Sequence, residues 1–177
     1  MDKFNYLALS DEEYMSLVED VLMSEGFQKL SEYPHHNECT RLDHCLHVSY
    51  SVYLFFKKYA PDYPYLKEAC RGALLHDFFL YDWHTENPFP VPCMHAWLHP
   101  KWAYNDAKKV FSLTPVEKDI ITKHMFPVSI NPPRTKASWM VVIFDKYWAF
   151  KEGIAHFNLI EFIKLQFRSS ANSKMDK

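Results

Sequence analysis

Apolar side chains recur at helical spacing along most of the chain. Because this spacing places them on one face of an α-helix, it predicts a series of amphipathic helices. No stretch alternates strictly between apolar and polar residues, so no predicted strand competes with the helices. The polar segment 31–39 contains a proline and is expected to be a loop. The predicted helices cover residues 11–25, 41–59, 65–77, 100–110, 115–125, 135–150 and 154–167.

Local signals set the expected boundaries of these helices. Ser10 begins a capping motif, and the acidic residues after it stand at the positive end of the helix dipole. Gly26 is expected to end that first helix. Pro100 suits the first turn of a helix, and Thr114 precedes a proline and a glutamate in the order typical of a helix N-terminus. Gly153 is expected to separate the last two helices.

The length and composition favour one ordinary globular domain. A chain of 177 residues, 48% of them hydrophobic, is long enough for one packed core and too short to expect two. Together with the helical pattern, this predicts an all-α fold, a single-domain helical bundle. Only three glycines are present, which argues against a glycine-rich phosphate-binding loop.

Charge and targeting features exclude several classes of partner. The formal net charge is −2, so no overall positive field attracts a nucleic acid polymer or an anionic membrane. The four cysteines form no CxxC pair, which excludes zinc-ribbon and thioredoxin-type interpretations. The N-terminus lacks the features of a secretory signal, and no apolar run is long enough to cross a bilayer. These features predict a cytoplasmic protein with reduced thiols and no membrane partner.

Three ionisable residues interrupt apolar runs. Asp145 follows an apolar stretch that begins at Trp139, and the pair His76 and Asp77 stands between leucines and phenylalanines. Such surroundings should bury these side chains. A buried carboxylate without a partner is protonated or destabilising, so it needs a cation, a metal or several hydrogen-bond donors. These positions are therefore candidates for a functional site.

The donor types at these positions suit a transition metal. Histidine nitrogen and carboxylate oxygen together favour Mn, Fe, Co, Ni or Zn, and Mg where carboxylates and water dominate. On a helix, His76 and Asp77 would point about 100° apart. Each can still reach inward to an ion that lies beside the helix. The candidate positions include no thiolate, which disfavours a structural zinc site.

The order of these residues resembles the HD-domain family of metal-dependent phosphohydrolases. In that family an isolated His is followed by a His-Asp doublet and then by a distant Asp, on a bundle of helices. Members that bind two metals add histidines between the doublet and the last Asp. The resemblance covers roughly residues 40–150 and implies an HD-type bundle that binds one or two divalent transition metals. The implied ligands are His44, His76, Asp77, His99, His124 and Asp145.

The resemblance implies hydrolysis of a small phosphate ester, with a nucleotide as the first candidate. A metal lowers the pKa of bound water and stabilises negative charge on phosphoryl oxygens. Asp77 is the expected catalytic bridge if two ions bind, and Asp82 or His84 is the expected proton donor to the leaving oxygen. Four cationic residues close to the expected ligands are the expected phosphate-binding groups: Arg41, Lys101, Lys123 and Lys146.

Two positions depart from the family pattern. Many members have Arg three residues after the first His, where this chain has His47. Nucleotidases of the family often have Glu three residues after the doublet, where this chain has Leu80, and Asp82 is the nearest acidic substitute. The resemblance therefore supports the metal site more than any particular substrate. His47 is expected to hydrogen-bond behind the ligands, and His95 either ligates or supports a ligand. The remaining histidines are expected on the surface: His35, His36 and His156.

By this resemblance the single domain divides into three parts. Residues 1–39 are expected to form an N-terminal helix and loop packed on the core, and residues 40–150 the HD-type metal-binding region. Residues 151–177 are expected to form a C-terminal helix and a frayed tail. The last helix either packs on the core or provides the face of a homodimer.

Two other functions stay open on the sequence. Di-iron oxygenases with the same fold use a similar set of His and Asp ligands, and iron content with oxygen consumption would distinguish them. A non-catalytic nucleotide-sensing domain could also retain the site. Such a domain would bind its ligand without turnover.

Overall fold

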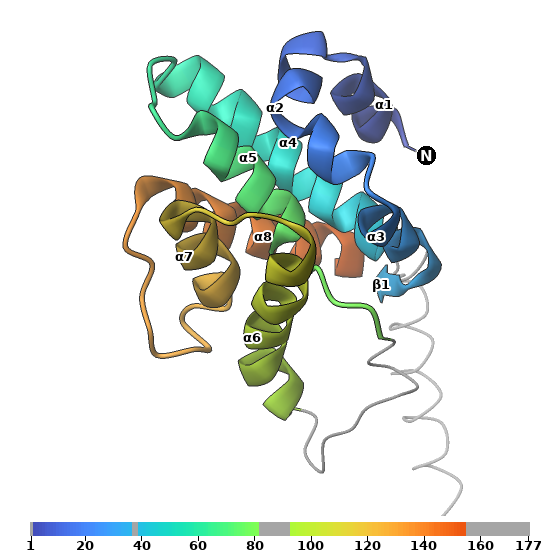
Figure 1. Ribbon diagram of the computed structural model, residues 1–177, viewed down its shortest axis with the longest axis vertical. Coiled ribbons are helices and arrows are strands. Elements are labelled where there is room, and N and C mark those ends of the chain that lie inside the picture. Colours follow the sequence, from blue (N-terminus) through green and yellow to red (C-terminus); the bar gives the residue numbers. More distant parts are fainter. Residues whose placement is uncertain (1, 37–38, 82–92, 155–177) are drawn as a thin grey trace, which may run out of the picture.

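The helix α4 (Arg41–Tyr59) is the centre of the bundle and packs against α5 (Leu66–Leu75) and α8 (Lys136–Ile154). In this computed structural model, which describes residues 2–36, 39–81 and 93–154, α7 (Pro115–Lys123) packs on α5 and α8. α6 (Cys93–Val110) packs on α7. Figure 1 shows α4 and α5 side by side through the middle of the molecule. The prediction of an all-α fold is confirmed.

The N-terminal region consists of α1 (Lys3–Ser10), α2 (Glu12–Leu22), the short helix α3 (Glu25–Gln28) and a 3-10 turn, η1 (Lys29–Glu32). α1 packs on α2 and α4, and α2 packs on α5 (Figure 1). Two short antiparallel strands follow, β1 (Pro34–His36) and β2 (Cys39–Thr40). The hairpin lies beside the N-terminal end of α4 and contacts α8.

Two helix starts lie where the sequence predicts them. Thr40 caps α4, and its hydroxyl and the carboxylate of Asp43 form a capping box. Thr114 and Glu117 form the same arrangement at the start of α7. Each box satisfies backbone N–H groups that the first turn of a helix leaves without partners. The motifs therefore fix the beginning of both helices.

Several other boundaries differ from the prediction. The N-cap of α2 is Asp11 rather than Ser10, because the Asp11 carboxylate accepts a hydrogen bond from the Tyr14 amide at 3.0 Å. The first predicted helix is preceded by α1, which begins after the capping residue Asp2. The segment 31–39, expected to be a loop, contains β1 and the first residue of β2, and both strands are too short to show an alternating pattern.

Pro100 lies inside α6 rather than in the first turn of a helix, so this boundary prediction was wrong. Gly153 is the next-to-last described residue of α8, and the helix expected after it lies outside the described part of the chain. A proline inside a helix removes one backbone hydrogen bond but need not end the helix when packing supports both sides. A single glycine lowers helix stability by only about 1 kcal/mol. The last predicted helix, 154–167, lies outside the described residues except for its first position, which belongs to α8.

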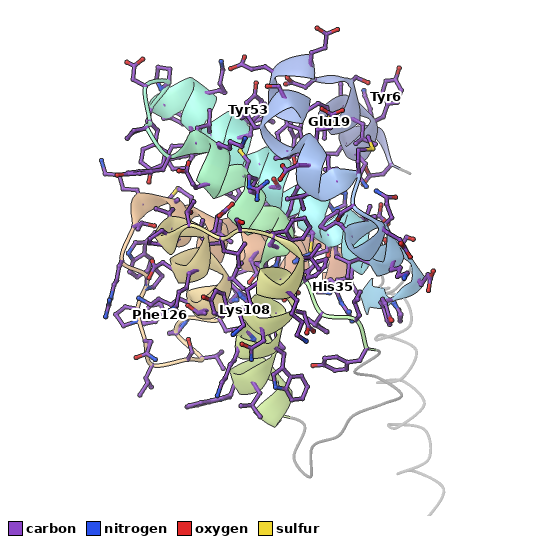
Figure 2. All side chains as sticks on the ribbon, viewed as in Figure 1. Tyr6, Glu19, His35, Tyr53, Lys108 and Phe126 are labelled. Carbon is purple, nitrogen blue, oxygen red and sulfur yellow. The ribbon has the colours of Figure 1, made fainter. Side chains whose placement is uncertain are left out.

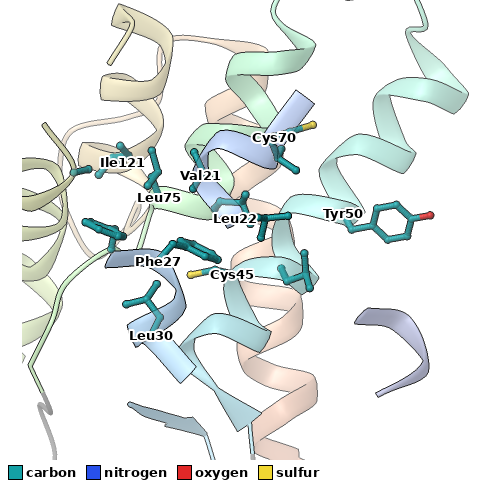
Figure 3. Packing of buried hydrophobic residues seen from close by; sticks show 14 of the residues in the cluster. Val21, Leu22, Phe27, Leu30, Cys45, Tyr50, Cys70, Leu75 and Ile121 are labelled. Atoms are coloured by element: carbon teal, nitrogen blue, oxygen red, sulfur yellow. The ribbon is translucent and has the colours of Figure 1, made fainter. Parts of the chain in front are cut away.

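Two clusters of buried apolar side chains hold the helices together. The first joins the N-terminal helices to α4, α5, α6 and α7, and Figure 3 shows part of it. The second lies between α4, α5, α7 and α8. Full burial of one large aliphatic or aromatic side chain stabilises a fold by roughly 1.5–3 kcal/mol. The labelled members in Figure 3 include Val21, Leu22, Phe27, Leu30, Leu75 and Ile121.

A close approach of α5 and α7 depends on Gly72. A Cβ atom at this position would lie 2.6 Å from Cδ1 of Ile120. The short separation brings the C-terminal ends of α5 and α7 together, and the two ends carry three of the expected ligands. Among the described helices, none combines the length and the apolar character needed to cross a membrane.

Candidate metal centre

The first of two buried ligand groups contains His44 on α4, His76 directly after α5, and Asp145 on α8; we call it the His44 triad. Its three ligand atoms lie within 4.8 Å of one another. Oδ1 of Asp145 is 3.2 Å from Nε2 of His44 and 3.7 Å from Nε2 of His76. Three separate elements therefore direct one carboxylate and two imidazoles toward the same point.

The second group contains Asp77, His99 on α6, and His124 directly after α7; we call it the Asp77 triad. Its ligand atoms also lie within 4.8 Å of one another. Oδ1 of Asp77 is 3.2 Å from Nε2 of His99 and 3.4 Å from Nε2 of His124. The two Nε2 atoms are 2.7 Å apart. All six residues that the sequence proposes as ligands are thus assembled into two triads, and all six are buried.

The two triads are neighbours because His76 and Asp77 are consecutive. Nε2 of His76 lies 3.7 Å from Oδ2 of Asp77. The ring of His76 packs edge-on against the ring of His124, with centroids 4.9 Å apart. Since α5 ends at Leu75, the two side chains extend from the turn after the helix.

Backbone carbonyls orient two of the histidines. Nδ1 of His76 lies 2.7 Å from the carbonyl oxygen of Ala73, and Nδ1 of His124 lies 2.9 Å from that of Ile121. A carbonyl only accepts, so Nδ1 carries the proton in both rings. In the neutral ring the lone pair is then on Nε2, which faces the triad. This is the orientation that a histidine ligand to a metal requires.

Two buried atoms of the centre have no hydrogen-bond partner within the described part of the chain, namely Nε2 of His76 and Oδ1 of Asp77. A buried polar atom without a partner costs about 1–3 kcal/mol, so native structures rarely leave one unexplained. Coordination of a cation would satisfy both atoms. The buried His and Asp groups could hold a metal ion, and two nitrogens with one carboxylate oxygen suit a divalent transition metal.

The carboxyl groups of the centre stay ionised despite burial. Burial raises the pKa of Asp77, but the charges of His76 and His99 outweigh this effect and hold that pKa well below its ordinary value. Burial likewise raises the pKa of Asp145, but the hydrogen bond from His44 and the charges of Lys146 and His76 outweigh this effect and hold that pKa well below its ordinary value. Each triad therefore contains a negative charge that positive charge must balance.

The histidines respond to these carboxylates differently. Burial lowers the pKa of His44, yet hydrogen bonds to Asp145 and Glu152 raise it to about 9. Burial also lowers the pKa of His76, but the charge of Asp77 outweighs this effect and raises the pKa of His76 well above its ordinary value. Burial and the charge of His99 hold the pKa of His124 well below its ordinary value. Protons on His44 and His76 thus balance the carboxylates, and a divalent metal would displace them.

The four cationic residues expected to bind phosphate occupy different environments. The Lys146 ammonium donates to Oδ2 of Asp145 at 2.6 Å and to the carbonyl of His124 at 3.2 Å, so it contacts the centre. Lys123 pairs with Asp119 at 2.6 Å, and Lys101 is exposed on α6.

The fourth cation, Arg41, is fully buried. Its guanidinium donates to the carbonyls of Phe79 and Tyr81 and lies over the Phe79 ring, 3.8 Å from the centroid. Both carbonyls belong to the segment that follows the His-Asp doublet. This placement favours a structural role for Arg41 over the expected phosphate-binding role, because both terminal nitrogens of its guanidinium donate to backbone carbonyls.

The expected proton donors Asp82 and His84 lie outside the described residues. The same holds for the side chain of His95, whose backbone belongs to α6, and for the side chain of His36 and the whole of His156.

His35 was expected on the surface, and that prediction was wrong. Its ring stacks on the ring of His44 with centroids 3.9 Å apart, and only 12% of its side chain is exposed. One of its nitrogens lies within 4.8 Å of ligand atoms of His44 and Asp77. His35 belongs to β1, and Figure 2 shows it at the end of the bundle where the hairpin meets α4. Nothing in the sequence of the polar segment 31–39 indicates this position.

Glu152 was not singled out from the sequence, although its carboxylate contacts two histidines of α4. Oε2 lies 2.8 Å from Nδ1 of His44, and Oε1 lies 2.9 Å from Nδ1 of His47. Residues seven apart on a helix lie on the same face, so the spacing from Asp145 could have indicated Glu152. The helix predicted from the sequence ends at residue 150, so Glu152 lies outside it.

Comparisons of the chain with protein-family models, with curated proteins and with solved structures found no match. The function has to be inferred from the residues of this chain and from their geometry.

Proposed function

We propose that the chain is a metal-dependent phosphohydrolase of the HD-domain type that acts on a small phosphate ester, with a nucleotide as the first candidate. One observation carries the proposal. Six His and Asp residues in the order of the HD pattern, spread over about a hundred positions, meet in two adjacent buried triads. Burying six ionisable groups together is energetically costly unless a bound cation or other partners compensate them.

Each triad would hold one divalent ion. His44, His76 and Asp145 offer two nitrogens and one oxygen to the first ion, and the Asp77 triad offers the same set to the second. Oδ2 of Asp77 faces Nε2 of His76 at 3.7 Å, so Asp77 is the candidate to contact both ions. Mn, Fe, Co, Ni and Zn suit these donors. When bound, such an ion lowers the pKa of water and offsets negative charge on the phosphoryl group.

Lys146 is the chain's best candidate for a phosphate contact. Its side chain is 40% exposed, while its ammonium reaches Asp145 inside the centre. An ammonium in this position can donate to a phosphoryl oxygen that approaches from solvent. Asp82 and His84 follow closely after Tyr81 in the chain and stay the proposed proton donors to the leaving oxygen.

A di-iron oxygenase is the second candidate, and the composition of the triads favours it specifically. Two histidines and one carboxylate with open positions are the ligand set of many non-haem iron oxygenases. Both triads have this composition. Iron content and oxygen consumption distinguish this candidate from a hydrolase.

The test uses tag-free protein that is stripped of metal and reloaded separately with Mn, Fe, Co, Ni, Zn or Mg. Release of inorganic phosphate is measured with nucleoside monophosphates and p-nitrophenyl phosphate, and p-nitrophenol release with bis-p-nitrophenyl phosphate as the diester. We expect metal-dependent turnover in the wild type and none in Asp77→Ala, while Glu13→Gln, an exposed change on α2, keeps full activity.

Three outcomes would count against the proposed function. Turnover that persists in Asp77→Ala would show that another site is responsible. Oxygen consumption by the iron-loaded protein without phosphate release would favour the oxygenase. Nucleotide binding without turnover under any metal would favour a non-catalytic sensing domain.

A further inference from the structure

Glu152 connects the metal centre to a second histidine of α4. The residue lies in the last turn of α8 and is 8% exposed. One carboxylate oxygen contacts Nδ1 of His44 at 2.8 Å, and the other contacts Nδ1 of His47 at 2.9 Å. A carboxylate that accepts two such hydrogen bonds fixes the orientation of both rings.

The two acidic residues of α8 contact opposite nitrogens of one imidazole. Asp145 and Glu152 are seven residues apart, which is about two helical turns, so both lie on the face of α8 that packs on α4. Oδ1 of Asp145 is 3.2 Å from Nε2 of His44, and Glu152 is at Nδ1. The ring therefore has one orientation in which Nε2 faces the triad.

We propose that Glu152 is the positioning residue of the metal centre: by accepting the Nδ1–H of His44, it presents the Nε2 lone pair of His44 to a divalent metal in the His44 triad. The inference rests on the proposed function only in requiring that a metal binds this triad. It concerns metal binding and makes no claim about which substrate is turned over. Carboxylates in this position hold the tautomer of a ligating histidine and increase its basicity.

His47 supports Glu152 from the other side. Its Nε2 lies 2.9 Å from Oδ2 of Asp2, and its ring stacks on Trp148 with centroids 4.3 Å apart. His44 and His47 are three residues apart on α4, so they lie on the same face and can share one carboxylate. The second hydrogen bond keeps Glu152 in place when His44 binds a metal.

The experiment compares the wild type with Glu152→Gln and Glu152→Asp, using zinc as the probe. Zinc affinity is measured by competition with a chelator, and the ring N–H groups of the zinc-loaded, 15N-labelled protein are observed by NMR. The His44 signal is assigned by its absence in His44→Gln. The matched control is Glu13→Gln, which makes the same chemical change at a carboxylate that pairs with Lys57 on the surface.

We expect Glu152→Gln to weaken zinc binding by about 10–100-fold. The amide presents an acceptor to only one of the two rings, so the hydrogen-bonded Nδ1–H signal of His44 should be lost or exchange-broadened. Glu152→Asp keeps the negative charge and should bind zinc more tightly than Glu152→Gln. If Glu152 only stabilised the fold, this recovery of zinc affinity would not be explained. Glu13→Gln should match the wild type in both measurements.

The inference is overturned if folded Glu152→Gln binds zinc as tightly as the wild type and keeps the His44 Nδ1–H signal, or if folded Glu152→Asp binds zinc no more tightly than Glu152→Gln. It is also overturned if the wild type binds no divalent metal. A wild type that binds zinc, responds to Glu152→Gln as expected and hydrolyses no phosphate ester would support the positioning role while refuting the proposed function.

Discussion

His76 and Asp77 are consecutive in the chain but belong to different triads. Nε2 of His76 lies 3.7 Å from Oδ1 of Asp145, whereas Oδ1 of Asp77 lies 3.2 Å from Nε2 of His99. The helix α5 ends one residue before this pair, so the two side chains can diverge. A single peptide bond therefore joins the two triads and sets the distance between them.

Because the triads are separate, single substitutions should remove one ion at a time. If the wild type binds two equivalents of metal, Asp145→Ala should lose the ion of the His44 triad and His99→Gln that of the Asp77 triad. Each variant should keep about one equivalent and lose hydrolysis, as measured by elemental mass spectrometry and phosphate release. Complete loss of metal in both variants would show one shared site instead of two.

Arg41 should contribute mainly to stability. Its guanidinium donates to two backbone carbonyls in the segment after the doublet, and lysine cannot reproduce this planar geometry. Arg41→Lys should leave a buried carbonyl without a donor and lower the free energy of unfolding by about 1–3 kcal/mol. Urea denaturation measures the loss. A variant with unchanged stability and a raised KM would support the phosphate-binding role that the sequence suggests.

Asp119 should make stability depend on acid pH. Its carboxylate accepts hydrogen bonds from the Ser138 hydroxyl and the Arg134 amide, 2.7 and 2.8 Å away, and pairs with Lys123. Burial raises the pKa of Asp119, but these partners outweigh it and lower that pKa below its ordinary value. In the unfolded chain the carboxyl takes up a proton at higher pH than in the fold. The stabilisation is therefore present above the unfolded pKa of about 3.9 and is lost as pH falls through the folded value.

The corresponding experiment compares Asp119→Asn with the wild type by denaturant unfolding from pH 3 to pH 7. We expect the variant to be less stable by about 1–2 kcal/mol above pH 5, with the difference shrinking toward pH 3. Asp62→Asn is the control at an exposed position and should show no such trend. A difference that stays constant over the whole range would refute the role of the Asp119 charge.

Two glycines in helices should respond in opposite directions to alanine. At Gly72 the new Cβ would meet Ile120 at 2.6 Å, so α5 and α7 must separate or Ile120 must shift. Gly72→Ala should destabilise the fold by about 1–3 kcal/mol. At Gly153 a Cβ meets nothing within 4 Å, and alanine should stabilise α8 by up to about 1 kcal/mol. Thermal unfolding of both variants measures the contrast, and equal effects would contradict the close approach of α5 and α7.

The sequence predicts the helical elements well where both periodicity and capping residues are present. α4 has the predicted bounds, and α7 begins where Thr114 and Pro115 indicate. A predicted helix boundary is wrong where it depends on one residue type alone. Pro100 is expected in the first turn of a helix, but α6 begins at Cys93 and continues through this position.

Half of the ligand set was predictable because the apolar surroundings of His76, Asp77 and Asp145 are visible in the sequence, whereas His44, His99 and His124 are implied only by the resemblance to the HD-domain family. An aspartate such as Asp145 within an apolar helix requires compensation by a cation or by hydrogen-bond donors. Contacts that depend on the path of a short irregular segment were not predictable. His35 reaches the centre only because the hairpin of β1 and β2 turns toward α4 and α8.

Metal content of the purified, tag-free wild type, measured by elemental mass spectrometry beside Asp77→Ala, tests the central claim most directly. We predict one or two equivalents of a divalent transition metal in the wild type and a clear loss in the variant. A wild type that contains no metal, and takes up none after incubation with Mn, Fe or Zn, would contradict the existence of the metal centre.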